Sequence, residues 1–194
     1  MIKRICVYCA SSNQVAPKYF EAANRLARLF VDEGITVVYG GGSTGLMGEL
    51  ATSALRAGGH VIGIMPNFMK EVEWAHQEVK EFLFVGDMHE RKKKFLEYSD
   101  ALVALPGGTG TLEELLEAIT LKRLGLFLKP IVILNQDGYY DPLLQMLDRC
   151  VEEKFMGAGH TLIWKAVDSA EQVLPAIREM PDWDANAIHE ARLL

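Results

Sequence analysis

A glycine-rich turn holds the residues whose types and spacing could best support chemistry. The segment PGGTGTLEE, residues 106–114, follows the apolar run ALVAL and leads into a sequence with helical periodicity. Its glycines allow the main chain to approach a ligand closely, and the N–H groups and positive dipole end of the following helix attract an anion. The pattern predicts a site for a phosphorylated small molecule, with the Glu114 carboxylate one turn into the helix.

Glu114 also has a structural interpretation. Thr111 and Glu114 have the spacing of a capping box, in which Thr111 is the N-cap and the glutamate side chain returns to the N-cap backbone. The two interpretations are compatible, because a capping carboxylate still lies at the helix start. The spacing alone leaves both open.

A charged cluster, DMHERKKK at residues 87–94, marks the start of another predicted helix, and its first and fourth residues have capping-box spacing. Positive charges in the first turns oppose the helix dipole at a cost of about 0.3–1 kcal/mol each, so we expect something to compensate them. Arg91 is the candidate to bind phosphate or carboxylate, because its planar guanidinium makes bidentate contacts. Lys93 and Lys94 are expected to be solvated.

A second glycine cluster, GGGSTGLMG at residues 40–48, follows the predicted strand ITVVY and opens a helix. It satisfies the literal pattern G-x-G-x-x-G, but the next strand ends in VIGIMPN, without the acidic residue that binds the ribose in a dinucleotide site. It also lacks the ending of a Walker A loop. We expect it to form a second wall of one nucleotide pocket; the alternative is that its glycines only let the helix pack on the strand.

The elements that must position these residues alternate along the chain, which indicates βαβ units. The predicted strands cover residues 2–9, 35–39, 60–65, 81–85, 101–105, 129–134 and 161–165, and the predicted helices cover residues 45–57, 17–33, 88–98, 112–125, 142–154 and 169–179. We expect an α/β fold: a doubly wound, Rossmann-like parallel sheet with helices on both faces. Ligands collect at the carboxyl ends of such strands, where these motifs lie.

Two further expectations concern local structure. The apolar stripe of helix 112–125 should face the sheet through Leu112, Leu115, Leu116, Ile119 and Leu124. The NQDGYY segment, residues 135–140, is expected to be a structural loop that ends with Asp141 as the N-cap of the next helix.

Length and composition suit a single domain over residues 1–194, with 49% hydrophobic residues. The net charge of −6 argues against nucleic acid or an acidic membrane as partner. No apolar run approaches the roughly 18 residues that span a bilayer, and no signal peptide is evident, so a cytoplasmic location is expected. The three cysteines have no framework spacing, as in a reducing compartment. No cluster has metal-ligand spacing, and neither metal nor cofactor is expected.

The motifs DMHERK, PGGTGTLEE and GGGSTGLMG together closely resemble the Lonely Guy (LOG) family of cytokinin riboside 5′-monophosphate phosphoribohydrolases. The resemblance extends from the first strand to at least the NQDGYYDP segment. It implies hydrolysis of the N-glycosidic bond of a nucleoside 5′-monophosphate, either AMP or an N6-modified cytokinin riboside monophosphate, to free base and ribose 5-phosphate. Family members are often labelled lysine decarboxylases, but these glycine loops offer no evident lysine for pyridoxal phosphate.

The resemblance also implies that Arg91 and Glu114 are the catalytic pair. Glycosidic cleavage passes through an oxocarbenium-like state, so Glu114 could stabilise positive charge, activate water or attack covalently. Arg91 would orient the phosphate or neutralise the anionic assembly. The residues expected to line the substrate site are Glu78, Lys92, Gly107, Gly108, Thr109, Gly110, Thr111, Leu112, Glu113 and Thr120, with Gly41, Gly42 and Ser43 from the second cluster. Thr109 stands where plant members commonly have tyrosine.

Family members are typically homodimers with the substrate near the subunit interface, so a homodimer is expected. Two other classes of protein remain alternatives. Related folds with similar glycine loops, such as molybdenum-cofactor carriers, bind phosphorylated ligands without cleaving them, and the chain would then be a non-catalytic nucleotide or cofactor carrier. A DNA-binding module is disfavoured by the net charge of −6.

Overall fold

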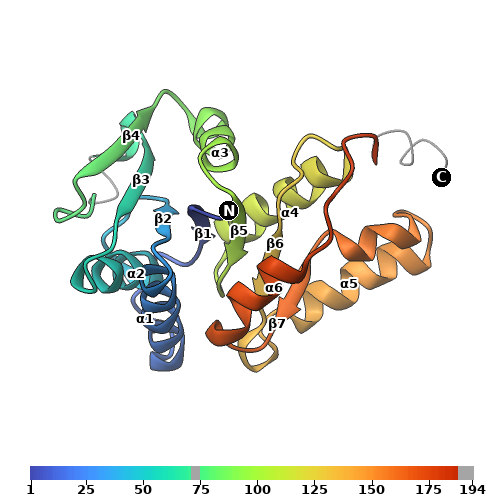
Figure 1. Ribbon diagram of the computed structural model, residues 1–194, viewed down its shortest axis with the longest axis horizontal. Helices are drawn as coiled ribbons and strands as arrows, with labels where there is room; N and C mark the ends of the chain where they lie inside the picture. Colours follow the sequence, from blue (N-terminus) through green and yellow to red (C-terminus); the bar gives the residue numbers. More distant parts are fainter. Residues whose placement is uncertain (71–74, 188–194) are drawn as a thin grey trace.

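The computed structural model describes residues 1–70 and 75–187 and contains a seven-stranded sheet in the order β4-β3-β2-β1-β5-β6-β7 (Figure 1). All adjacent strands are parallel. The strands are β1 (Arg4–Tyr8), β2 (Thr36–Tyr39), β3 (Val61–Pro66), β4 (Glu81–Val85), β5 (Ala101–Ala104), β6 (Ile131–Leu134) and β7 (Lys165–Val167). The strand order runs outward from β1 in both directions, which confirms the predicted doubly wound, Rossmann-like sheet.

Helices cover both faces of this sheet. One face carries α1 (Pro17–Asp32), α2 (Gly45–Arg56) and α6 (Val173–Glu179), and the other carries α3 (Met88–Glu97), α4 (Thr109–Arg123) and α5 (Asp141–Glu152). The described residues also form four short 3-10 helices: η1 (Asn67–Lys70), η2 (Gln136–Gly138), η3 (Ala158–Leu162) and η4 (Ala170–Gln172).

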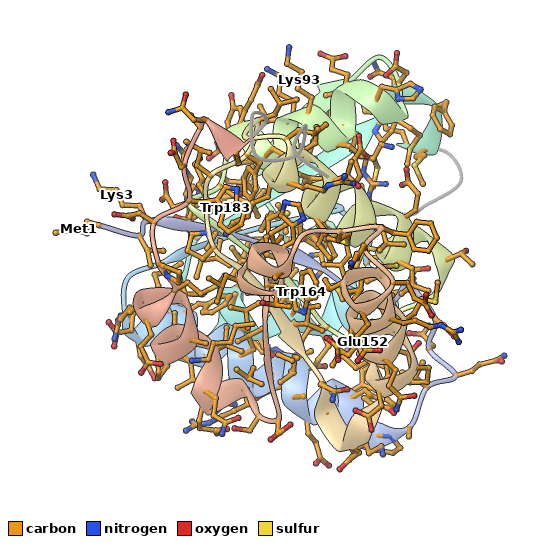
Figure 2. All side chains as sticks on the ribbon, turned by 90° about the vertical axis from the view of Figure 1, so that its right-hand side faces the viewer. Met1, Lys3, Lys93, Glu152, Trp164 and Trp183 are labelled. Atoms are coloured by element: carbon orange, nitrogen blue, oxygen red, sulfur yellow. The ribbon has the colours of Figure 1, made fainter. Side chains whose placement is uncertain are left out.

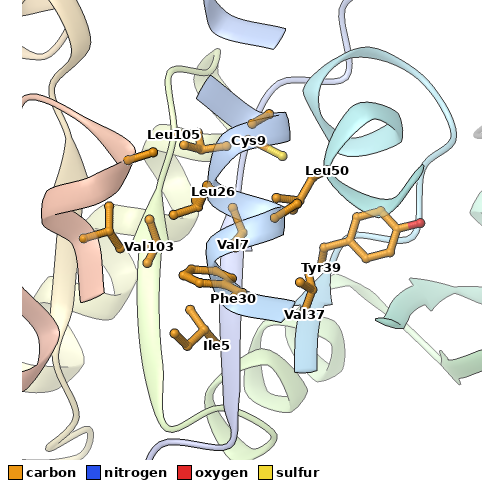
Figure 3. Packing of buried hydrophobic residues seen from close by; sticks show 14 of the residues in the cluster. Ile5, Val7, Cys9, Leu26, Phe30, Val37, Tyr39, Leu50, Val103 and Leu105 are labelled. Carbon is orange, nitrogen blue, oxygen red and sulfur yellow. The ribbon is translucent and has the colours of Figure 1, made fainter. Parts of the chain in front are cut away.

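The central strand β1 is buried from both sides. Ile5 and Val7 pack into the hydrophobic cluster beneath α1, beside Leu26 and Phe30 (Figure 3). The alternate residues of β1 belong to the cluster on the opposite face. Because successive strand side chains point to opposite faces, a shift of one residue would exchange these two sets, and each fully buried aliphatic side chain is worth about 1.5–3 kcal/mol. The position of β1 in the sheet is therefore tightly specified.

The strand order reverses between β1 and β5, which pair side by side with Tyr8 opposite Ala104. From β1 the chain continues to α1 on one face, and from β5 it continues to α4 on the other. Connections that leave in opposite directions open a crevice at the carboxyl ends of the two strands. The glycine-rich turn, residues 106–108, lies at this point.

The structure corrects the prediction for the last strand. The sequence predicts a strand over 161–165, but residues 158–162 form η3, at whose start the Gly157 N–H donates to His160 Nδ1 (2.9 Å). Ile163 and Trp164 are still buried, so the burial expected of a strand is met without strand geometry. The strand β7 begins only at Lys165.

The helix α4 also differs from its predicted form. It begins at Thr109, three residues earlier than expected. Leu115 and Ile119 are buried as expected, but Leu116 is 39% exposed and points away from the sheet. The apolar stripe of α4 is therefore wider than the part of the helix that the sheet buries.

The C-terminal segment packs against the far end of α4. The indole N–H of Trp183, the residue labelled in Figure 2, donates to the Lys122 carbonyl (2.6 Å). The ring centroid of Trp183 lies 5.6 Å from Lys122 Nζ. Burial lowers the pKa of the Lys122 amine to about 8, and this amine donates to the Lys129 carbonyl (2.9 Å). The terminal residues 188–194 lie outside the described part. Within the described part, no helix combines the length and apolar character needed to cross a membrane.

Candidate active site

A pocket of about 300 Å³ opens at the carboxyl ends of β1 and β5. Its walls come from the exits of three strands, β1, β2 and β5, and from helix α3, which places side chains distant in sequence around one space. The residues that line it are Val7, Tyr8, Cys9, Ala10, Ser11, Ser12, Gly40, Met47, Arg91, Phe95, Gly108, Thr109, Gly110, Thr111 and Glu114. The predicted pair, Arg91 and Glu114, is thus brought together with the glycine-rich turn.

The start of α4 supplies backbone hydrogen-bond donors beside this pocket. Gly108 is the N-cap, and the first helical hydrogen bond runs from the Leu112 N–H to the Gly108 carbonyl (3.0 Å). The N–H groups of the three residues between them precede this ladder, as at every helix start. Since those residues line the pocket, the helix dipole and these donors favour an anion there.

The capping-box interpretation of Thr111 and Glu114 is wrong. Thr111 is the third residue of the helix and not its N-cap. A Cβ atom at Gly107 would lie 2.2 Å from Thr111 Oγ1, so the threonine side chain packs back over the space that this glycine leaves. Glu114 is then the sixth helical residue, with its side chain only 13% exposed at the pocket wall.

Arg91 is buried, and its guanidinium is held on three sides. Its Nε donates to the Ile64 carbonyl and its Nη2 to the Gly40 carbonyl, both at 3.0 Å. Its Nη1 lies 3.9 Å from Glu114 Oε1, and the guanidinium carbon lies 5.2 Å from the centre of the Phe95 ring. Charge-assisted hydrogen bonds of this kind fix the orientation of the guanidinium, and Arg91 is one of the residues that line the pocket.

The helix that carries Arg91 starts as predicted. The Asp87 carboxylate accepts from the Glu90 N–H (2.8 Å), and Glu90 accepts in return from the Gly86 N–H (2.7 Å). Lys93 extends into solvent with 74% of its side chain exposed (Figure 2), whereas Lys94 is 32% exposed and pairs with Glu97. The cap places two N-terminal acids where the helix dipole favours them.

The second glycine cluster packs against Arg91, and most of it does not line the pocket. A Cβ atom at Gly40 would lie 2.4 Å from Arg91 Nη2. Only Gly40 and Met47 of this cluster are among the lining residues, and the predicted substrate residues Gly41, Gly42 and Ser43 lie outside the lining. The G-x-G-x-x-G spacing is therefore explained in part by packing around a buried side chain.

The loops after β1 and β2 are tied to each other. Asn13 Oδ1 accepts from the Gly45 N–H (2.7 Å), and the Thr44 hydroxyl donates to the Ser11 carbonyl (3.0 Å). Gly45 has φ +62°, and a Cβ there would meet the Ser11 carbonyl carbon at 2.4 Å. Ser11 and Ser12 line the pocket. The sequence places their small hydroxyls at a strand exit, but this pattern also suits an ordinary loop, which is the interpretation that the sequence favours.

Other predicted substrate residues lie in a shallow groove on the outer side of α3 and α4. Lys92, Leu112, Glu113 and Thr120 line it together with His89, Leu116 and Glu117, and Thr109 borders both this groove and the pocket. Lys92 Nζ lies 2.5 Å from Glu113 Oε1 and 2.6 Å from Glu117 Oε2, and these bonds raise the pKa of the lysine.

Glu78 lies outside both spaces and is exposed. Its N–H donates to His76 Nδ1 (3.3 Å), and the His76 N–H donates to the Gly41 carbonyl (3.1 Å). Glu78 is thus linked to the second glycine cluster rather than to Arg91 and Glu114. Within residues 1–70 and 75–187, no group of three or more His, Cys, Asp or Glu side chains is placed to hold a metal ion.

The sheet topology defines a Rossmann-like α/β protein with a pocket lined by a glycine-rich turn at its switch point. A family model described as "Possible lysine decarboxylase" matches residues 47–177. A cytokinin riboside 5′-monophosphate phosphoribohydrolase of Arabidopsis thaliana is 42% identical over 94% of this chain and 84% of its own length. The rice enzyme LOG, from Oryza sativa subsp. japonica, is 41% identical over 98% of this chain and 79% of its own length. The chain belongs to the LOG family.

Solved structures with the same fold are more distant. The molybdenum cofactor carrier protein of Chlamydomonas reinhardtii has a TM-score of 0.70 and 23% identity, covering 93% of this chain and 98% of that one. The molybdenum cofactor binding protein of Rippkaea orientalis has a TM-score of 0.69 and 23% identity, covering 92% and 96%. At this identity the likeness shows the shared fold alone.

Gly40→Ala is expected to displace the Arg91 guanidinium, because the added methyl group would lie 2.4 Å from Nη2. Loss of the bond to the Gly40 carbonyl should lower the free energy of unfolding by about 1–3 kcal/mol, the range for a buried polar group left unsatisfied. Denaturant unfolding and a crystal structure of the variant measure both effects. Gly159→Ala is the matched control, since a Cβ there meets nothing within 4 Å. An unmoved guanidinium and unchanged stability would contradict this account.

Proposed function

We propose that this protein hydrolyses the N-glycosidic bond of a nucleoside 5′-monophosphate, either AMP or an N6-modified cytokinin riboside monophosphate, to free base and ribose 5-phosphate. The observation that carries the proposal is the buried pair of Arg91 and Glu114 beside the N-terminus of α4. Family membership supports it, because the relatives are named for this reaction.

The geometry suits the charges of this reaction. A 5′-phosphate binds at residues 108–111, where the α4 N–H groups and dipole attract it, whereas the predicted substrate residue Gly107 lies just outside the pocket lining. The Glu114 carboxylate then lies near the ribose, where it stabilises the positive charge that develops at the anomeric carbon, activates the attacking water, or attacks that carbon directly. Arg91 offsets the two anions that share this space, which would otherwise repel each other in a poorly solvated pocket.

We propose that the groove residues Lys92, Leu112, Glu113 and Thr120 complete the site in a homodimer. The groove adjoins the pocket at Thr109, and Leu116 leaves an apolar side chain 39% exposed within it. An exposed apolar side chain flanked by the charged Lys92 and Glu113 is typical of a surface that a second subunit covers. Four predicted substrate residues lie outside the pocket and the groove: Glu78, Gly41, Gly42 and Ser43. In this proposal they reach the substrate when a partner subunit or the substrate itself binds.

The product assay decides between hydrolase and carrier. Purified protein incubated with AMP and with N6-prenylated AMP is expected to release the corresponding base together with ribose 5-phosphate in equal amounts, measured by liquid chromatography. The neighbours of known structure that carry molybdenum cofactor share the fold only. Tight binding of nucleoside monophosphates with no product would overturn the hydrolase in favour of a carrier.

Glu114→Gln is expected to lower kcat by at least about a hundredfold, because the amide neither accepts a proton nor stabilises positive charge as a carboxylate does. Steady-state kinetics with AMP measure this, and circular dichroism checks that the fold is kept. Glu97→Gln, which neutralises an exposed carboxylate at the end of α3, is the control and should keep the wild-type rate. A Glu114→Gln rate within a few fold of wild type would remove Glu114 from the chemistry.

Leu116→Asp is expected to convert the proposed homodimer to monomers, since it places a charge in the apolar part of the groove. Sedimentation velocity measures the mass of wild type and variant. The control is Leu162→Asp, because Leu162 is a leucine in η3 that is also exposed, at 55%, and lies outside the groove. A Leu116→Asp variant that still sediments as a dimer would exclude this face as the interface.

A further inference from the structure

Two tyrosine hydroxyls of the NQDGYY segment, between β6 and α5, donate hydrogen bonds to the backbone at the glycine-rich turn. The Tyr139 hydroxyl donates to the Gly107 carbonyl (2.7 Å), and the Tyr140 hydroxyl donates to the Leu105 carbonyl (2.6 Å). Both carbonyls belong to the stretch that leads from β5 to the first residue of α4. The loop therefore contacts the backbone of the candidate phosphate site, although neither tyrosine lines the pocket.

The local structure of this segment fixes the direction of both rings. Asp137 and Gly138 have φ +52° and +73°, and a Cβ at Gly138 would lie 2.5 Å from Asp141 Oδ2. Asn135 accepts from the Tyr140 N–H (2.6 Å) and donates to the Asp141 carboxylate (2.7 Å). Asp141 is the first residue of α5 and not its predicted N-cap, so its side chain holds the turn instead.

The two tyrosines differ in how much they are buried. Tyr140 is 1% exposed, and burial raises the pKa of its phenol, which keeps the hydroxyl protonated as a donor. Tyr139 is 42% exposed, and its ring packs edge-on against Tyr140 at 5.0 Å and against Tyr19 at 5.9 Å. Removing the Tyr139 hydroxyl leaves these ring contacts in place.

Each tyrosine hydroxyl binds a backbone carbonyl, and its effect on the turn depends on whether the residue after that carbonyl has an N–H group. In a planar trans peptide the C=O of one residue and the N–H of the next point in opposite directions. A bond from Tyr139 to the Gly107 carbonyl therefore directs the Gly108 N–H away from Tyr139, and Gly108 lines the pocket. The residue after Leu105 is Pro106, which has no N–H, so the Tyr140 bond directs no donor.

We propose that Tyr139 is a positioning residue for the phosphate of the substrate: its hydroxyl holds the Gly107–Gly108 peptide with the Gly108 N–H turned toward the anion. The inference rests on the proposed function for the identity of the ligand. Without this hydroxyl, a peptide flanked by two glycines rotates readily, and the donor is lost for part of the time.

Calorimetric titration with the two reaction products tests the proposal, because both are stable in the presence of the enzyme. Tyr139→Phe is expected to weaken binding of ribose 5-phosphate by about three- to tenfold, the effect of one oriented hydrogen bond. Its affinity for adenine, which has no phosphate, should equal that of wild type. In the activity assay, KM for AMP should rise by a similar factor with kcat little changed.

Tyr140→Phe is the matched control, because it removes the same group from the neighbouring residue without affecting a pocket N–H. It should lower the melting temperature and leave the ribose 5-phosphate affinity unchanged. The proposal is overturned if both variants weaken ribose 5-phosphate equally, if adenine binding falls in parallel, or if wild type does not bind ribose 5-phosphate. Failure of the proposed hydrolase is a separate result: wild type would bind ribose 5-phosphate yet release no base from AMP.

Discussion

The buried guanidinium of Arg91 imposes the strictest requirement on this fold. Removing a charge from water costs several kcal/mol, which only close partners can offset. Here the partners are the carbonyl of Gly40, directly after β2, the carbonyl of Ile64, within β3, and the carboxylate of Glu114 on α4. Two strands and two helices must therefore keep their relative positions for one side chain to be satisfied.

The helix α4 connects the Arg91 contact to the other parts of the site. Its first residues line the pocket, Glu114 faces Arg91, and its outer side, which includes Leu116, forms the groove with Lys92. At its other end, the carbonyl of Lys122 is bound by Trp183. A helix held at both ends and along one side places its N-terminal donors rigidly, and rigid donors do not need to reorganise when charge develops in a reaction.

The fold followed from the sequence because its signals are local: alternating apolar and helical patterns predicted the sheet. Arg91 and Glu114 were each singled out by residue type and position, and the resemblance to the LOG family paired them. The failures involve information that is not local. The Thr111 cap was wrong because Gly108 begins the helix through its backbone alone, and Leu116 because an apolar stripe does not distinguish a sheet from an open groove. The packing of Gly40 depends on a side chain 51 residues later, which no local pattern contains.

The contact between Gly40 and Arg91 also has an evolutionary consequence. The guanidinium of Arg91 fills the space that a side chain at position 40 would occupy, so the residues at positions 40 and 91 are expected to vary together. A substitution at position 40 displaces the Arg91 guanidinium and costs stability unless position 91 has first become shorter. Related sequences should therefore change at both positions or at neither, and such paired change would distinguish this glycine from those whose task is to accommodate a ligand.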